Sequence, residues 1–81
     1  MIVVYSKDMC PYCDRTKDKL NEMGLEYTEI NVSKNPDKRE FLKEEGHRTV
    51  PQIYINGKVV PGGNNAFQLM NERQIKEWNN G

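Results

Sequence analysis

The chain has 81 residues, of which 36% are hydrophobic and 30% charged, and its 12 basic and 12 acidic side chains give a formal net charge of zero. This length suits a single domain with a modest core, and the balanced charge argues against a dedicated nucleic-acid or membrane-surface binder. No apolar run approaches the roughly 20 residues of a transmembrane helix. The N-terminus lacks a basic segment followed by a long apolar run, so we expect no signal peptide and a cytoplasmic location.

The first predicted elements are a strand and a helix. Ile2 to Tyr5 is a run of β-branched and aromatic residues, which is typical of a strand buried on both faces. The helix should begin at Pro11, where the missing N–H would be unpaired anyway, and end at Gly24, a residue suited to a left-handed stop. Between these ends, four residues recur at helical spacing and form a buried stripe: Cys13, Thr16, Leu20 and Met23.

A second strand and a second helix follow. Leu25 to Val32 is predicted to be the strand, and the strand–helix–strand order implies a right-handed parallel crossover. Asn35-Pro36-Asp37 is typical of a helix start, with a capping residue, a proline and an acidic first turn. This helix should stop at Gly46.

The next stretch predicts a hairpin. Gln52 to Ile55 is a run typical of a third strand. Asn56-Gly57 is the strongest short hairpin signal, so Lys58 to Val60 should pair antiparallel with the third strand.

The C-terminal part predicts an irregular turn and a broken helix. Pro61-Gly62-Gly63 forces the turn, and a helical region begins near Asn64. Its apolar spacing slips later, and Asn71 with Gln74 resembles a fresh cap, so we expect a break there and a short terminal helix from Glu72 to Trp78. The whole order predicts an α/β protein in which a small sheet is layered with helices.

The two cysteines are the strongest chemical signal. Cys10 and Cys13 lie three positions apart at a strand-to-helix turn, where backbone N–H groups and the helix dipole favour an anion such as a thiolate. This spacing brings the Cα atoms to about 5–6 Å, close enough for a disulfide. We expect Cys10 to be the more exposed, attacking thiolate and Cys13 to resolve the mixed disulfide from the buried side. Lys7, Arg15 and Lys17 add local positive potential.

Two other interpretations of the cysteines were weighed. A zinc site needs four ligands, and His47 is the only histidine in the chain, so we expect no metal. A purely structural disulfide is disfavoured by the position at a helix start. His47 itself is expected to be a loop residue without a catalytic role.

Three short motifs together carry a family resemblance. Cys10-Pro11-Tyr12-Cys13 after a first strand, Thr49-Val50-Pro51 before a third, and Gly62-Gly63 before the last helix resemble a dithiol glutaredoxin. The resemblance spans residues 1–81 as one domain and implies a thioredoxin-like fold, with a four-stranded mixed sheet flanked by helices in the order β-α-β-α-β-β-α. It also implies glutathione as co-substrate, and protein disulfides or glutathionylated proteins as substrates. Ribonucleotide reductase is a candidate client, and we expect a monomer.

The same resemblance implies one end of a glutathione site. Lys7 and Arg48 match residues that contact the glycine carboxylate, and a guanidinium suits this task. Lys38 or Arg39 falls near a third such position, with a solvated surface charge as the alternative. Tyr12 matches an aromatic wall beside the sulfurs, although it could simply be a packing residue.

The resemblance implies the other end as well. Thr49, Val50 and Pro51, with a cis bond before the proline, would present backbone groups to the tripeptide. Gly63, Asn64 and Asn65 lie at a helix start, where the backbone N–H groups of the two asparagines would hold the γ-glutamyl carboxylate. Ala66 stands where an aspartate is expected for the ammonium group, which predicts weakened glutathione use.

Three functions therefore follow from the sequence. The leading one is a glutathione-dependent thiol–disulfide oxidoreductase that acts on protein disulfides and glutathione mixed disulfides. The second is a glutaredoxin-like redoxin reduced by thioredoxin reductase, which the missing acidic residue favours. The third, from another class, is a non-catalytic thioredoxin-fold module that binds a partner or an iron–sulfur cluster, and the intact cysteine pair argues against it.

Overall fold

A computed structural model describes residues 1–80 and contains four strands and four helices within them. The expected order of elements is confirmed, and the last helical region is divided in two. The elements are β1 (Ile2–Ser6), α1 (Pro11–Glu22), β2 (Thr28–Asn31), α2 (Pro36–Glu44), β3 (Gln52–Ile55), β4 (Lys58–Val59), α3 (Gly63–Leu69) and α4 (Glu72–Asn80).

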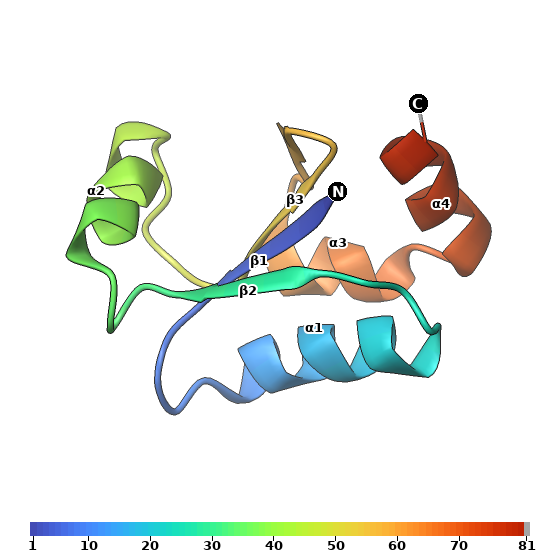
Figure 1. Cartoon of the computed structure of the whole chain (residues 1–81), viewed down its shortest axis with the longest axis horizontal. Helices are drawn as coiled ribbons and strands as arrows, with labels where there is room; N and C mark the ends of the chain where they lie inside the picture. The colour runs from blue at the N-terminus through green and yellow to red at the C-terminus, as the bar shows by residue number, and fades with distance from the viewer. Residues whose placement is uncertain (81) are drawn as a thin grey trace.

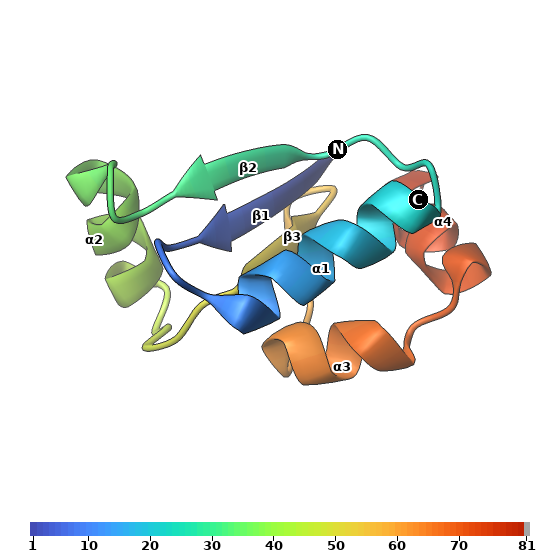
Figure 2. The same ribbon diagram turned by 90° about the horizontal axis from the view of Figure 1, so that it is seen from below.

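The strands form one mixed sheet in the order β2-β1-β3-β4. β1 pairs parallel with β2 and antiparallel with β3, and β4 completes the hairpin on β3. The arrows of β1 and β2 both point toward α2 in Figure 2. The four-stranded mixed sheet that the resemblance implies is therefore confirmed.

Both faces of the sheet are buried, because alternate residues of a strand point to opposite sides. On one face, Val4 and Ile53 join a core with residues of α1, α3 and α4, including Leu20, Phe67 and Ile75. On the other face a smaller core lies beneath α2 and contains Tyr5, Val32, Leu42 and Tyr54. α1 and α3 lie side by side on the first face, and α2 stands apart from them (Figures 1 and 2).

The predicted second strand was too long. Strand pairing covers only Thr28 to Asn31, whereas Leu25 and Tyr27 belong to the connection and pack partly buried against the core. Apolar residues indicate that a segment is buried, but not that it pairs with a strand. A connection that crosses the edge of the core buries such residues without forming the hydrogen bonds of a sheet. Beyond the strand, the Val32 N–H still donates to the Ser6 carbonyl at 2.8 Å.

The start of α2 is confirmed, with Asn35 at the N-cap position, Pro36 in the first turn and Asp37 as its acidic residue. The Asn35 side chain makes no capping hydrogen bond to the helix. Its Nδ2 instead donates to the Asn31 carbonyl at 2.8 Å, while the Asn35 carbonyl accepts from the Lys38 and Arg39 N–H groups at 3.1 Å. The asparagine therefore occupies the N-cap position of α2, while its side chain ties the helix start to the end of β2.

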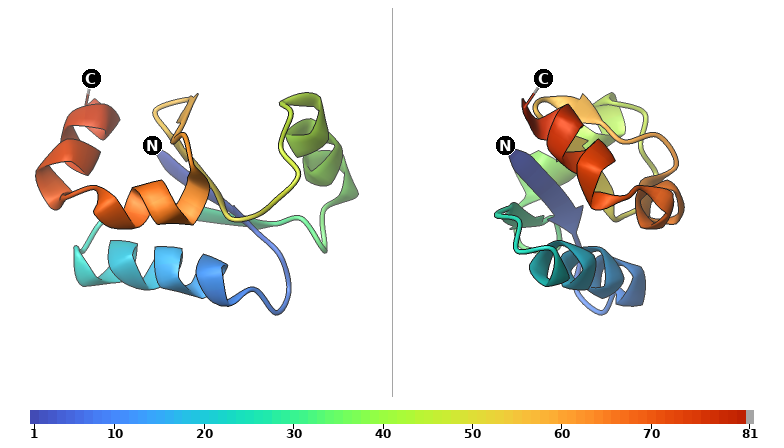
Figure 3. Two further views of the ribbon diagram at one scale, coloured as in Figure 1. Left: turned by 180° about the vertical axis from the view of Figure 1, so that it is seen from behind. Right: turned by 90° about the vertical axis from the view of Figure 1, so that its right-hand side faces the viewer.

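The break before α4 is confirmed together with its cause. The Gln74 N–H donates to Asn71 Oδ1 at 2.8 Å, and the Asn71 N–H donates to Gln74 Oε1 at 2.9 Å. This reciprocal pair is a capping box. α4 lies beside the N-terminus (Figure 3), where the Met1 ammonium donates to Asn79 Oδ1 at 2.6 Å. None of the helices in residues 1–80 has the length and apolar character needed to cross a membrane.

Candidate active site

Cys10 and Cys13 form a disulfide across the first turn of α1, with their Cα atoms 5.2 Å apart. Cys10 is the residue that caps the helix, and its sulfur accepts from the Cys13 N–H at 3.2 Å. Cys13 lies on the buried stripe at 1% exposure, against 7% for Cys10. Cys10 is thus the more accessible of the two sulfurs, as expected.

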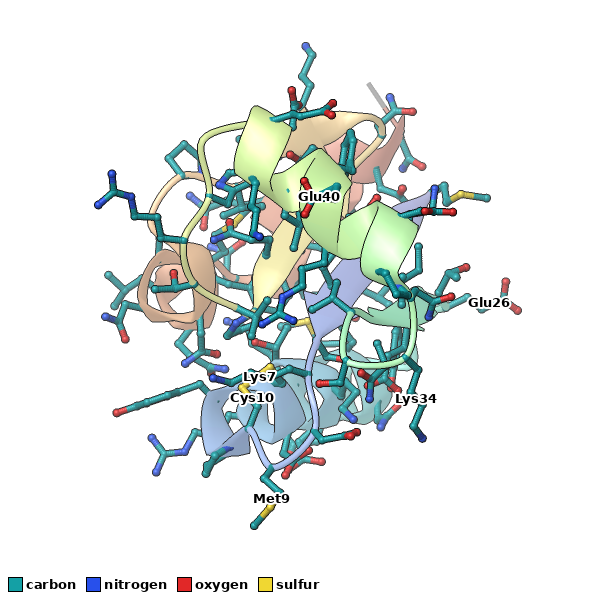
Figure 4. All side chains as sticks on the ribbon, turned by 90° about the vertical axis from the view of Figure 1, so that its left-hand side faces the viewer. Lys7, Met9, Cys10, Glu26, Lys34 and Glu40 are labelled. Atoms are coloured by element: carbon teal, nitrogen blue, oxygen red, sulfur yellow. A yellow bond between two sulfur atoms is a disulfide. The ribbon has the colours of Figure 1, made fainter. Side chains whose placement is uncertain are left out.

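Hydrogen bonds from the end of β2 and from the segment that follows β2 fix the loop before Cys10. The Asp8 N–H donates to Ser33 Oγ at 3.1 Å, and Asn31 Nδ2 donates to Asp8 Oδ1 at 2.8 Å. Met9 then turns the chain in a left-handed conformation with φ of 54° and leaves its side chain 98% exposed. Figure 4 looks onto this end of the molecule, where Met9 points away from the body beside Cys10.

The second motif lies against the first. The Val50–Pro51 peptide bond is cis, as the resemblance implies. The Val50 carbonyl oxygen lies 4.0 Å from Cys10 Sγ. The third motif meets Pro51 in turn, because a Cβ at Gly63 would come within 3.2 Å of the Pro51 carbonyl oxygen. Three segments far apart in the chain therefore converge on the disulfide.

Two hollows adjoin at this point. One, of about 580 Å³, runs toward α3 and the other, of about 480 Å³, runs toward α2; His47, Thr49 and Val50 line both. Every residue predicted to bind glutathione lines one of the two hollows. The α3 side holds Tyr12, Pro51, Gly63, Asn64 and Asn65, and the α2 side holds Lys7 and Arg48. Of the two uncertain residues on α2, Arg39 lines its hollow and Lys38 does not.

Asn64 is fixed in the wall of the α3-side hollow. It is 8% exposed, and its Oδ1 accepts from Thr16 Oγ1 at 2.8 Å and from Gln68 Nε2 at 3.0 Å. Thr16 comes from the buried stripe of α1, so this hydrogen bond positions the start of α3 against the helix that carries the cysteines. The two walls of the hollow are thereby joined.

With this geometry in place, the comparison with protein families is decisive. A glutaredoxin family model matches residues 2–60. The chain belongs to the glutaredoxin family. It is accordingly a thiol–disulfide oxidoreductase, and the paired Cys10 and Cys13 are its close cysteine pair.

Relatives and solved structures agree with this glutaredoxin assignment. Glutaredoxin 3 of Escherichia coli K12 is 36% identical over 69 residues, which cover 84% of this chain and 83% of the relative. Glutaredoxin 1 of Rickettsia conorii is 39% identical over 77 residues, covering 91% and 76%. A crystal structure of a buckwheat glutaredoxin–glutathione complex has a TM-score of 0.79 at 28% identity, covering 98% of this chain and 76% of that one. The NrdH-redoxin of E. coli, described as a glutaredoxin-like protein with a thioredoxin-like activity profile, has a TM-score of 0.72 at 25% identity, covering 86% and 95%.

The glutaredoxin groove has one feature that the sequence interpretation missed. His47 is a loop residue as predicted, but it lines both hollows, and its Nε2 lies 2.9 Å from the Tyr54 hydroxyl. Tyr54 is 9% exposed and also reaches Glu45 at 3.5 Å. Burial, followed by the Glu45 carboxylate, raises the pKa of Tyr54. No sequence signal distinguishes this histidine, because its partner lies in β3 and is brought to it only by folding.

The two α3 residues that follow Asn64 line different hollows. Ala66 lines neither hollow beside the disulfide; it lies in a separate one with Val60, Pro61 and Trp78. Asn65 is the residue of α3 whose position next to Asn64 lines the glutaredoxin groove. No carboxylate of the described residues lines the α3-side hollow, and the uncharged Asn65 lies in its wall.

The predicted positive potential near Cys10 is only partly present. Lys17 pairs with Glu29 at 2.9 Å, and Ser6 Oγ donates to the same carboxylate at 2.7 Å. The hydrogen bond with Glu29 raises the pKa of Lys17 and, with that from Ser6, lowers the pKa of Glu29. Arg15 lies over the Tyr12 ring at 5.4 Å. Lys17 thus ties α1 to β2. Of Lys7, Arg15 and Lys17, Lys7 is the one that lines a hollow beside the disulfide.

Metal-ligating side chains do not gather in the part of the chain that the structure describes. Residues 1–80 contain no cluster of three or more His, Cys, Asp or Glu side chains that could hold a metal ion.

Proposed function

We propose that this glutaredoxin uses glutathione as its electron donor to reduce protein disulfides and glutathione mixed disulfides. The observation that carries the proposal is the groove itself, with cations at one end and a helix start at the other. Val50 lines both hollows, and its carbonyl oxygen lies 4.0 Å from Cys10 Sγ. Glutathione has a carboxylate at each end and a thiol in the middle, so it matches this order. The buckwheat glutaredoxin, which shares the fold, is a glutathione complex.

Each part of the groove has a proposed role. Lys7 and Arg48 bind the glycine carboxylate, since a guanidinium gives a strong charge-assisted hydrogen bond. Val50, between Thr49 and Pro51, presents its backbone to the cysteine of the tripeptide. The backbone N–H groups of Asn64 and Asn65, following Gly63, receive the γ-glutamyl carboxylate, and the exposed Tyr12 ring covers the sulfurs.

The proposed reaction is two successive thiol–disulfide exchanges. The Cys10 thiolate attacks a disulfide of the substrate, forms a mixed disulfide and releases one substrate thiolate. Cys13 then attacks Cys10 Sγ, releases the second thiolate and closes the Cys10–Cys13 disulfide. Two glutathione molecules reduce this disulfide and leave as oxidised glutathione, so two electrons pass from glutathione to the substrate. On a glutathionylated substrate, glutathione itself completes the reaction.

The second candidate function keeps the chemistry and changes the donor. The likeness to NrdH-redoxin and the neutral Asn65 in the groove favour reduction by thioredoxin reductase. The decisive measurement compares glutathione plus glutathione reductase with thioredoxin reductase on one common disulfide substrate. We expect turnover with the glutathione system to exceed that with thioredoxin reductase; the reverse order would assign the second function.

We also propose a client protein and a cellular location. Ribonucleotide reductase is proposed as a client on the resemblance alone. A reducing cytoplasm is proposed as the location, because an exchange dithiol must be returned to its reduced form. A non-catalytic binding or iron–sulfur module is disfavoured by the paired cysteines, and visible absorbance in freshly purified protein would favour it instead.

A carboxylate restored at Asn65 should strengthen glutathione use. In Asn65→Asp the new charge can pair with the ammonium group of the γ-glutamyl residue, so we expect KM for a glutathionylated peptide to fall about twofold to fivefold, the scale of one exposed ion pair. Ala66→Asp is the matched comparison, with the same charge on the same helix outside the lined groove. Steady-state kinetics measure both variants. If KM falls for Ala66→Asp alone, the ammonium group lies near residue 66, as the resemblance implies. That result would contradict the proposed pairing at residue 65.

A further inference from the structure

The charged residues that line the hollow on the α2 side of Cys10 are all basic. Lys7, Arg39, Lys43 and Arg48 line it together with His47, and no Asp or Glu does. Positive charge is concentrated here, because the chain as a whole has equal numbers of basic and acidic side chains. The hollow on the α3 side is lined by no Lys, Arg, Asp or Glu. The charge next to the disulfide is therefore one-sided.

Glutathione does not use all of this charge. The proposed function assigns Lys7 and Arg48 to a single glycine carboxylate, and the resemblance puts Arg39 near the same group. Even with Arg39 counted there, several cations face one negative charge, and Lys43 is left over. Arg39 and Lys43 are four residues apart on one helix, so they face the same side. Lys43 contacts Glu40 at 3.3 Å, but both side chains are more than half exposed, at 61% and 64%. An ion pair so open to solvent neutralises little of the charge.

The geometry indicates which side of the reacting cysteine of a bound peptide lies near the excess positive charge. The two hollows meet at Val50, whose carbonyl oxygen lies 4.0 Å from Cys10 Sγ. In glutathione, glycine follows cysteine, so the proposed binding mode puts the residue after the reacting cysteine over the basic hollow. A longer polypeptide bound in the same direction would continue from Lys7 and Arg48 toward α2.

We propose that this protein acts on disulfides of polypeptides that carry acidic side chains just after the reacting cysteine, and that Arg39 and Lys43 select them. The direction of binding rests on the proposed use of glutathione. The carboxylates of the substrate meet solvated cations at the edge of the groove, so their main effect is on the rate of productive encounter. The chemistry is unchanged: the reduced dithiol gives two electrons to the peptide disulfide, releases two peptide thiols and closes the Cys10–Cys13 disulfide.

A single-turnover assay without glutathione tests the proposal. The probes are two disulfide-linked homodimers, made from two peptides of equal composition. One peptide has two glutamates after its cysteine, and the other has them before it. Reduced protein is mixed with each dimer, and acid-quenched samples are separated to measure released thiol. At low salt, we expect the glutamate-after dimer to oxidise the protein about tenfold faster than the glutamate-before dimer does. This difference should shrink as added salt screens the charges.

Two charge-reversal variants locate the effect. Arg39→Glu/Lys43→Glu should remove the preference for the glutamate-after dimer. Lys58→Glu/Lys76→Glu changes the net charge equally at exposed positions of β4 and α4 and should keep it. Equal rates for the two dimers, a preference for the glutamate-before dimer, or the same loss in both variants would overturn the proposal. The assay contains no glutathione, so its result does not depend on which reductant supplies the electrons. If glutathione is not the electron donor, this shows only in the comparison of glutathione reductase with thioredoxin reductase described above.

Discussion

Cys10→Ser should lose both disulfide reduction and deglutathionylation, with rates falling by ~10³-fold or more, because it removes the only accessible nucleophile at the start of α1. The Cys10 sulfur caps α1 and lies beside the Val50 carbonyl where the two hollows meet, and serine cannot form a thiolate there. Turnover of a peptide disulfide and of a glutathionylated peptide measures both activities.

Cys13→Ser is the matched variant and should separate the two activities. Cys13 is 1% exposed, so its role is to attack Cys10 from within the protein. Without it, glutathione can still resolve the Cys10–glutathione mixed disulfide, so deglutathionylation should stay within about threefold of the native rate. Reduction of peptide disulfides through the closed Cys10–Cys13 pair should be lost. Complete loss of deglutathionylation in Cys13→Ser would contradict the assigned roles.

Lys19→Met should cost about 2 kcal/mol of unfolding free energy, the largest stability effect that we expect from a single surface cation. Lys19 Nζ, on α1, donates to the carbonyls of Phe67 at 2.7 Å, Gln68 at 3.0 Å and Met70, and it lies 5.2 Å from the centre of the Phe67 ring. These carbonyls lie at the C-terminal end of α3, where a cation is favoured. Burial lowers the pKa of Lys19, so desolvation offsets part of the gain and the net effect stays well below the sum of three charged hydrogen bonds.

Urea denaturation of the oxidised proteins measures this difference. Methionine keeps the length and the apolar stem of the side chain, so the change removes the charge and its hydrogen bonds more than the packing. Lys76→Met is the control, because Lys76 is 53% exposed and pairs only with Glu72 at 3.3 Å. The control should change stability by less than about 0.5 kcal/mol. Equal losses in the two variants would show that the contacts of Lys19 with α3 contribute nothing specific.

Local signals predicted most elements correctly. The cysteine pair at a helix start, the stop at Gly24 and the Asn71–Gln74 capping box all depend on backbone preferences within about four residues, and all three are found in the structure. The continuous apolar run from Ile2 to Tyr5 likewise predicted that β1 is buried on both faces. Apart from Lys38, the glutathione-binding residues carried over from the resemblance each line at least one of the two hollows.

Long-range contacts were beyond the reach of the same signals. The length of β2 depends on which residues find partners on β1, and the side chain of Asn35 prefers a β2 carbonyl to its own helix. The partners of His47 and Lys19 lie in other elements and have no periodic pattern in the chain.

The sequence by itself determined the chemistry of this protein, because a cysteine pair on the first turn of a helix is a local arrangement. Only the tertiary structure decided what surrounds that pair. Val50 lies 40 positions from Cys10, and packing of α1 against α3 through Thr16 and Asn64 positions the far wall with Asn64 and Asn65. The crossover of the chain likewise brings the cations of α2 to one side of the disulfide. Nucleophile and helix start are properties of neighbouring residues, whereas the groove and its charge exist only once distant segments pack together.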